Sequence, residues 1–222
     1  MGNGNQMIKV LYEDNHLIGV LKDVNIPTQK DSSNDVDMVT IVKDYIKEKY
    51  NKPGNVYLGL LHRLDRPVSG VMVFAKTSKA AERMTKMIKN HEVNKTYYAV
   101  LEGKIDSKGR LIDKLLKDER TNTVRVSKDG KEAILDYERV DYKDNYSLVK
   151  INLITGRSHQ IRVQFSSRGY PLYGDQRYNK QDKKQIALFC SSMSFIHPVT
   201  KEKIEIKDNL PNRYPFNIFK GE

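Results

Sequence analysis

Apolar residues at alternating positions open the chain and predict a pair of strands. Ile8, Val10 and Tyr12 stand at every second position, with Lys9 and Leu11 between them, a polar turn follows at residues 13–16, and an apolar run occupies residues 17–21. A period of two is typical of a strand that buries one face. We therefore expect two short strands around a polar turn.

Two later segments have apolar residues three or four positions apart and predict helices. The first follows a polar loop at residues 25–34, with Asp35 or Ser33 as its expected N-cap, and ends at residues 51–54. The second is expected over residues 78–90, with one apolar face. The apolar positions are Val36, Val39, Val42, Ile46 and Tyr50 in the first helix, and Ala80, Ala81, Met84, Met87 and Ile88 in the second.

Strand-like segments outnumber the helices and lie in groups between them. They are residues 56–61, 71–75, 97–101, 148–154 and 204–206, with a Lys-rich stretch of strands and turns before residue 148. This order favours the α+β class, with a mixed or antiparallel sheet. Because no repeat or linker is visible, we expect a single domain over residues 1–222, with residues 1–6 as a short disordered leader.

The excess of basic residues indicates the kind of partner that the protein binds. Lys and Arg number 39 against 28 Asp and Glu, which gives a net charge of +11 and a pI near 9.5. Such an excess favours binding to polyanions, of which nucleic acid is the commonest, although a generically basic protein has the same balance.

Cysteine content and apolar runs indicate the compartment. Cys190 is the only cysteine, which excludes an internal disulfide, and its apolar surroundings predict a buried packing role. No apolar run approaches the ~20 residues of a membrane span, and the N-terminus lacks a signal pattern. The sequence therefore predicts a cytoplasmic protein that does not bind membranes.

Metal and nucleotide chemistry have little support. The sequence has no glycine-rich phosphate loop, and its five histidines are scattered without the spacing of a metal site. From the residues alone, a zinc site is not expected.

The first of two dense polar clusters is His62–Gly70, which reads HRLDRPVSG and lies between two apolar strands. Asp65 stands there between Arg63 and Arg66. Exposed ion pairs of this kind are common and stabilise little. Loops carried by rigid strands, however, are where catalytic groups concentrate, and this placement favours a functional site.

The second cluster is Thr155–Arg162, which reads TGRSHQIR and enters a helix-like segment ending at Gly169. Ser158 is the expected cap, and the amides at the start of this helix would favour a phosphate. Ile161 and Phe165 are expected to face the core. Arg157 and Arg162 are five positions apart, so one is expected outward and the other inward. An ordinary amphipathic helix fits the spacing as well.

Together these clusters resemble the RluA family of RNA pseudouridine synthases, over nearly the whole chain. The order and spacing of five motifs carry the resemblance. They are HRLD-x-x-TSG, present here as HRLDRPVSG at His62–Gly70, K-x-Y at Lys95–Tyr97, TGR-x-HQIR at Thr155–Arg162, GD-x-x-Y at Gly174–Tyr178 and HP at His197–Pro198.

The resemblance implies an α+β fold with a mixed, mainly antiparallel sheet core, flanking helices and a cleft for RNA. It also implies no metal or organic cofactor, and a defined set of site residues. Asp65 would be the catalytic aspartate, Tyr97 would stack on the uracil and take part in proton transfer, and Arg162 would pair with Asp65. Arg63 resembles the arginine that fills the gap left by the extruded nucleotide. The further residues expected to bind substrate or RNA are His62, Lys95, Arg157, His159 and Gln160.

The expected reaction needs the same parts. It breaks the uridine N1–C1′ bond, turns the base and rejoins it through C5. A neighbouring guanidinium favours the ionised form of a carboxylate. Extruding a paired uridine costs a few kcal/mol, and stacking on an aromatic ring, worth roughly 1–3 kcal/mol per base, offsets part of that cost. Whether Asp65 attacks the sugar, attacks the ring or removes a sugar proton stays open.

Three departures from the family pattern bear on substrate choice. Lys22-Asp23 stands where many relatives have Lys-Pro, Val68 replaces a threonine, and Gln164 replaces a histidine. The catalytic pattern begins by about Ile8, so no N-terminal S4 RNA-binding domain is expected. Nothing indicates an obligate protein partner, and a monomer is expected.

Two other functions compete with uridine isomerisation. One is a catalytically silent RNA-binding or RNA-folding module, against which the intact set of Asp65, Tyr97 and Arg162 argues. The other is a basic nuclease or hydrolase, which would depend on a divalent metal. Within the main hypothesis, ribosomal RNA is the first candidate substrate and transfer RNA the second, by analogy with the family alone.

Overall fold

The computed structural model describes residues 8–179 and 184–219, and the expected leader at residues 1–6 lies outside them. The chain forms two compact units. The first comprises Met1–Val93 and Ser192–Asp208, and the second comprises Asn94–Ser191 and Asn209–Glu222. The single domain stays a prediction.

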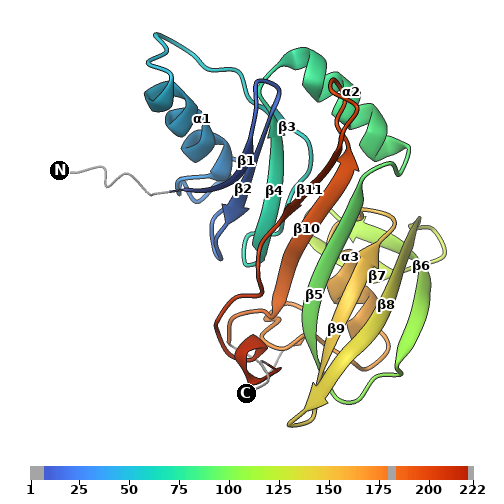
Figure 1. Ribbon diagram of the computed structural model, residues 1–222. Coiled ribbons are helices and arrows are strands. Elements are labelled where there is room, and N and C mark those ends of the chain that lie inside the picture. The colour runs from blue at the N-terminus through green and yellow to red at the C-terminus, as the bar shows by residue number, and fades with distance from the viewer. Residues whose placement is uncertain (1–7, 180–183, 220–222) are drawn as a thin grey trace. The chain divides into compact units, whose positions relative to one another are not determined.

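The first unit is built on β-strands with two helices (Figure 1). Its elements are β1 (Lys9–Glu13), β2 (Leu17–Lys22), α1 (Met38–Lys49), β3 (Gly59–Leu60), β4 (Ser69–Ala75), α2 (Ser78–Lys89), β11 (Lys203–Lys207) and the end of β10 (Leu188–Ile196). β2 pairs antiparallel with β1 and β4, β3 pairs antiparallel with β4, and β11 pairs antiparallel with β10. Every residue of β4 is buried, so this strand is the centre of the unit's core.

The two helices of this unit agree with the sequence pattern except at the start of α1. Its cap is Asp37, whose carboxylate accepts a 3.0 Å hydrogen bond from the Thr40 amide, so the expected caps Asp35 and Ser33 were wrong. Val36 lies before the helix and is exposed. The second helix, α2, begins after its cap Thr77 and spans Ser78–Lys89, close to the expected residues 78–90.

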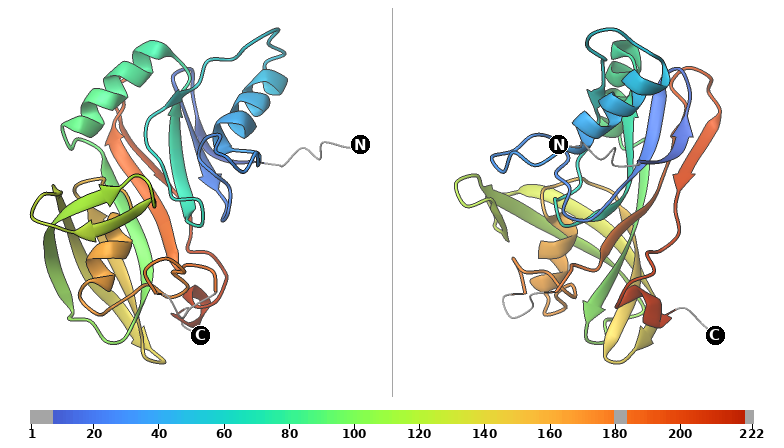
Figure 2. Two further views of the ribbon diagram at one scale, coloured as in Figure 1. Left: turned by 180° about the vertical axis from the view of Figure 1, so that it is seen from behind. Right: turned by 90° about the vertical axis from the view of Figure 1, so that its left-hand side faces the viewer.

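The second unit is a strongly curved set of antiparallel strands around one short helix (Figure 2). Its elements are β5 (Asn94–Glu102), β6 (Lys108–Asp118), β7 (Thr123–Val126), β8 (Lys131–Lys143), β9 (Tyr146–Leu153), α3 (Gln160–Ser166), the start of β10 and the 3₁₀ helix η1 (Phe216–Phe219). Their order is β10-β5-β9-β8-β6-β7. The Lys-rich stretch is thus the three strands β6, β7 and β8.

Helix α3 packs its apolar side against the strands of this unit. Phe165 is fully buried, with its ring edge-on to Tyr137 at 5.4 Å between centroids. Val163 packs with apolar side chains of β6, β7 and β8. Ile161 is 4% exposed, so both core positions expected in this helix are confirmed.

The predicted α+β class and the mixed, mainly antiparallel sheet are confirmed, and Cys190 is buried as expected. The strand expected at residues 56–61 is shorter, because only Gly59 and Leu60 pair with β4. The expected RNA cleft stays a prediction. In the described part of the chain, no helix combines the length and the apolarity that crossing a membrane requires.

Candidate active site

Asp65 lies in the loop of residues 61–68, hereafter the Asp65 loop, which connects β3 to β4 in the first unit. The side chains alternate before it: His62 is buried, Arg63 is exposed and Leu64 is buried. Leu64 exchanges two hydrogen bonds with Thr28, whose hydroxyl donates to the Leu64 carbonyl oxygen at 2.9 Å. Nε2 of His62 accepts from the Val73 amide at 3.0 Å. Asp65 itself is half-buried, and the hydrogen bonds of His62 and Leu64 hold the loop just before it.

Lys22 holds the far side of this loop from within the protein. Its side chain is fully buried, and its ammonium donates to the carbonyl oxygens of Arg66 at 2.9 Å, Val68 at 2.7 Å and Asp23 at 3.0 Å. Burial lowers the pKa of Lys22 to about 7, while the nearby charges of Asp65 and Asp23 oppose this shift. The sequence reasoning noted Lys22 only as a departure from a family pattern and missed this contact.

Arg66 joins the Asp65 loop to the polar loop that precedes α1. Its guanidinium contacts the carboxylates of Asp31 and Asp35 and the hydroxyl of Ser33. These groups are largely exposed, so the pairs fix the position of Arg66 more than they stabilise the fold.

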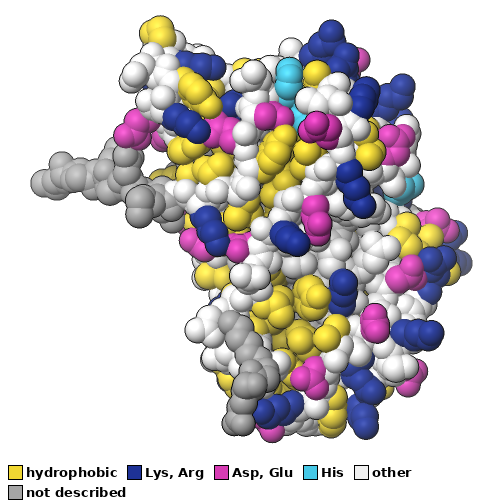
Figure 3. All heavy atoms as spheres, viewed as in Figure 1, with side chains coloured by type: hydrophobic (Ala, Val, Ile, Leu, Met, Phe, Trp, Pro, Cys, Tyr) yellow, Lys and Arg dark blue, Asp and Glu magenta, His cyan; other side chains and the backbone are white. Residues whose placement is uncertain are grey.

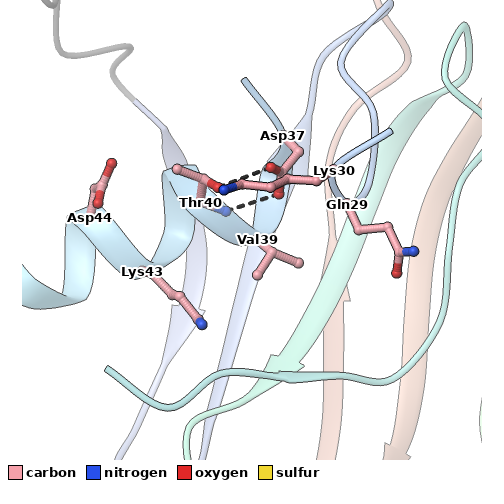
Figure 4. A pocket seen from close by; sticks show the side chains of 7 residues that line it. All are labelled: Gln29, Lys30, Asp37, Val39, Thr40, Lys43 and Asp44. Carbon is pink, nitrogen blue, oxygen red and sulfur yellow. Dashed lines mark hydrogen bonds between the residues drawn. The ribbon is translucent and has the colours of Figure 1, made fainter. Parts of the chain in front are cut away.

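The pocket drawn in Figure 4 lies beside this polar loop, at the start of α1. It has a volume of about 430 Å³, and none of the predicted site residues lines it. Asp37, which accepts from both the amide and the hydroxyl of Thr40, forms part of its wall. Lys30 and Lys43 are matched there by Asp37 and Asp44, so the pocket carries no net charge to attract a phosphate.

In the second unit, Lys95 and Tyr97 lie two positions apart on β5 and therefore share one face of the strand. Tyr97 is 6% exposed. The ammonium of Lys95 lies 4.0 Å from the place that a Cβ atom would take at Gly156. Burial lowers the pKa of Lys95. The K-x-Y and TGR motifs thus meet within this unit.

The side chain of Gln160 organises the turn before α3. It is 3% exposed, its amide oxygen accepts from the Thr155 hydroxyl at 2.8 Å and the Arg157 amide at 3.0 Å, and its nitrogen donates to the Ile134 carbonyl oxygen at 3.1 Å. These contacts give Gln160 a structural task, and its expected role in RNA binding stays a prediction. Arg157 is exposed, with Nε donating to the Glu132 carbonyl oxygen at 2.8 Å.

The start of α3 differs from the expectation. Its N-cap is His159, in the left-handed conformation with φ of 50°, and it makes no side-chain cap hydrogen bond, so Ser158 as the cap was wrong. Gln160 is the physical reason, because its side chain already binds the amide of Arg157 and shapes the turn. Nδ1 of His159 lies 2.6 Å from the Tyr178 hydroxyl.

Arg162 is held by the GD-x-x-Y motif. Its guanidinium forms a bidentate pair with Asp175, with Nε and Nη2 at 2.9 and 2.8 Å from the two carboxylate oxygens, and it lies 5.2 Å from the centre of the Tyr178 ring. Both partners of the pair are nearly fully buried. Gly174 has φ of +74°, and a Cβ atom there would lie 2.1 Å from the Gln185 carbonyl oxygen. Asp175 is thus a site residue that sequence reasoning missed, although the motif itself signalled it.

The predicted trio is divided between the two units, with Asp65 in the first and Tyr97 and Arg162 in the second. The predicted pairing of Asp65 with Arg162 stays a prediction. The pair with Asp175 uses two of the five N–H donors of a guanidinium, and it fixes the plane of the group. Among the described residues, no group of three or more His, Cys, Asp or Glu side chains is placed to hold a metal ion.

Comparison with protein-family models decides the class. The model described as RNA pseudouridylate synthase matches residues 16–167, which include the Asp65 loop, β5 and the TGR-x-HQIR motif. The chain belongs to the RNA pseudouridylate synthase family. The resemblance inferred from the motifs is thereby confirmed, and the chain is a member of a family of isomerases that convert uridine to pseudouridine in RNA.

Curated relatives of this pseudouridine synthase match most of its length. The RNA pseudouridine synthase YhcT of Bacillus subtilis is 31% identical over 211 residues, covering 92% of this chain and 69% of the relative. The tRNA pseudouridine synthase C of Haemophilus influenzae is 30% identical over 233 residues, covering 94% and 95%. The ribosomal large subunit pseudouridine synthase D of Zymomonas mobilis is 29% identical over 220 residues, covering 92% and 69%.

Solved structures share the fold of this pseudouridine synthase. The human RNA pseudouridylate synthase domain containing 4 superimposes with a TM-score of 0.77 at 20% sequence identity, covering 91% of this chain and 88% of the human one. The human RNA pseudouridylate synthase domain containing 1 gives a TM-score of 0.75 at 21% identity, covering 94% and 86%.

Proposed function

We propose that this chain converts specific uridines of structured RNA to pseudouridine, with Asp65 as the essential carboxylate. Ribosomal RNA is the first candidate substrate and transfer RNA the second, since relatives of similar identity carry names of both kinds. The observation that carries the proposal is the Asp65 loop, where a half-buried carboxylate of the family's HRLD motif stands on a base fixed by Lys22, Thr28 and Val73.

The reaction breaks one glycosidic bond and forms another. The N1–C1′ bond breaks, the base turns, C1′ bonds to C5, N1 gains a proton, and C5 loses one. Uracil, sugar and protons balance without water or an added reagent. In this scheme Asp65 assists cleavage at the sugar or ring, Tyr97 stacks on the extruded base and helps to move the C5 proton, and Arg162 stabilises the charge of Asp65.

Support for the role of Arg162 comes from its setting in the second unit. The Asp175 carboxylate fixes the plane of the guanidinium, and the Tyr178 ring packs against it. A guanidinium held in this way loses little further freedom when it binds a second carboxylate. The remaining proposed RNA contacts are His62, Arg63, Lys95, Arg157, His159 and Gln160; of these, Arg63 and Arg157 are exposed.

The test is release of tritium from RNA labelled at C5 of uridine, with Asp65→Asn as the variant. We expect turnover to disappear while RNA binding is retained, because Asn keeps the shape of the side chain and removes only its charge. Turnover by the Asp65→Asn variant would refute the role of Asp65. Wild-type protein that binds RNA but releases no tritium from any cellular RNA pool would indicate a silent RNA-binding module. Strand cleavage that stops in chelator would indicate a nuclease.

A further inference from the structure

The HP motif at His197–Pro198 builds the turn between β10 and β11 in the first unit. The His197 ring is fully buried, and its Nδ1 accepts hydrogen bonds from the amides of Val199 and Thr200, both at 3.0 Å. Nε2 lies 2.8 Å from Asp14 Oδ2, a close electrostatic contact without hydrogen-bond geometry. The buried ring therefore fixes this turn, and with it the direction of the Pro198 carbonyl group.

Two cations converge on this carbonyl oxygen. Nη1 of Arg83, from α2, donates to Pro198 O at 3.3 Å, and Nζ of Lys201 donates to the same oxygen at 3.1 Å. In the described part of the chain, neither cation forms an ion pair with a carboxylate. Some other cations of this chain do, including Lys49 and Lys76, which share Glu13. Like charges brought together in this way repel each other, and an anion beside them relieves that repulsion.

The same charge continues along α2. Lys79, Arg83 and Lys86 are four and three positions apart, so they lie on one face of the helix at successive rises of about 6 and 4.5 Å. All three are exposed. Glu82 is the only acidic residue of this helix, and it pairs with none of them within the described residues. Figure 3 shows Lys and Arg side chains gathered over α2. We call Lys79, Arg83, Lys86 and Lys201 the α2 basic face.

This face lies at the opposite end of β4 from Asp65. Asp65 precedes the first residue of β4, whereas α2 and the β1–β2 turn, which contacts His197 through Asp14, adjoin its last residue. A strand of seven residues spans about 20 Å. A ligand that reaches both places is much larger than one nucleotide.

We propose that the α2 basic face binds the phosphate backbone of the RNA substrate, outside the Asp65 loop and without reading sequence. The inference rests on the proposed function for its choice of RNA as the partner. Arg83 and Lys201 form its centre, because one from α2 and one from the β10–β11 turn converge on the Pro198 carbonyl oxygen. Lys79 and Lys86 extend it along α2, in a row that follows one strand of the backbone.

The experiment measures binding of a fluorescently labelled RNA hairpin by anisotropy, in a salt series between ~50 and ~200 mM. The variant is the double substitution Arg83→Gln and Lys201→Gln. Each phosphate contact contributes about 0.7–0.9 to the slope of log affinity against log salt, so the slope should fall by about 1.5. Tritium release at saturating RNA should equal that of the wild type, because neither residue belongs to the proposed catalytic set.

A matched control removes the same charge elsewhere. Lys108 and Lys150 are exposed and both stand opposite Glu138 on neighbouring strands, so Lys108→Gln with Lys150→Gln should leave the slope unchanged. A second control, Arg83→Lys with Lys201→Arg, keeps both charges and should keep the slope. The proposal is overturned if the neutral variant has the slope of the Glu138-facing control. It is also overturned if the charge-conserving variant loses as much slope as the neutral one. The hydrogen bonds of Arg83 and Lys201 to Pro198 would then only stabilise the turn.

These outcomes are distinguishable from failure of the proposed function. A wild-type chain that binds the hairpin, loses slope in the neutral variant and yet releases no tritium would refute the isomerase activity and leave the α2 basic face supported. Tritium release with an unchanged slope would refute the α2 basic face alone.

Discussion

Lys22 is a cation that the protein buries completely, and this has a consequence for stability. In the unfolded chain its pKa is near 10.5, and burial lowers that pKa to about 7 in the folded protein. Between these two values the unfolded state binds more protons than the folded state. The free energy of unfolding therefore rises with pH through this window, by up to ~1.4 kcal/mol per pH unit from Lys22 alone.

Lys22→Met tests this linkage. We expect the unfolding free energy of the wild type, measured relative to that of the variant, to rise from pH ~7 upward. Only the wild type carries the titrating group. Urea denaturation at a series of pH values measures it. Lys47→Met, at an exposed position of α1, is the control and should differ from the wild type by a constant amount. A constant difference for Lys22→Met too would mean that Lys22 does not titrate in this window.

At the scale of elements, α3 is tied to the turn after it by the Arg162–Asp175 pair. Removing one partner of a buried pair leaves an uncompensated charge and costs roughly 3–5 kcal/mol. We expect Asp175→Asn to destabilise the protein by that amount in urea denaturation. The comparison is Asp136→Asn, which breaks the exposed bidentate pair with Arg110 and should cost at most about 1 kcal/mol. Equal losses in the two variants would contradict the assignment of Arg162–Asp175 as a buried anchor.

The sequence predicted elements well wherever apolar residues recur at a regular spacing on one face of the element. Helix α2 was found nearly to the residue, because Ala80 and Met84 repeat at helical spacing after the cap Thr77. At α1 the apolar Val36 extended the pattern one step too far, since a helical period does not show where the first hydrogen-bonded turn begins. Local competition decided the start, because the Asp37 side chain reaches the Thr40 amide.

The candidate site shows more clearly what the sequence could not predict. Motif spacing indicated Asp65, Tyr97 and Arg162, but it carried no information about partners distant in sequence. Lys22 contacts carbonyl oxygens more than forty positions later in the chain, and backbone acceptors leave no trace in the sequence. Gln160 was expected to bind RNA from the family motif alone, and that motif did not reveal that its amide also binds the protein's own backbone.

For the protein as a whole, the effect of a net charge of +11 on RNA binding depends on where the cations lie. On the outer side of β6, β8 and β9, cations face acids across the strands, as Arg110 faces Asp136 and Lys150 faces Glu138. The α2 basic face has no such partners among the described residues. The excess charge is therefore unevenly distributed, and RNA binding is expected to depend on RNA length.

A comparison of two substrates tests this dependence. One is a structured RNA, and the other is a short single-stranded oligonucleotide with the same target uridine. The oligonucleotide reaches the Asp65 loop but does not extend the ~20 Å along β4 to α2. Its KM should therefore be higher than that of the structured RNA, at an equal kcat. In the variant carrying Arg83→Gln and Lys201→Gln, KM for the structured RNA should rise roughly tenfold, equivalent to ~1.4 kcal/mol of binding, while KM for the oligonucleotide stays constant. Steady-state tritium release measures both. A variant that raises both KM values equally would place these cations at the uridine itself and not at a distant phosphate.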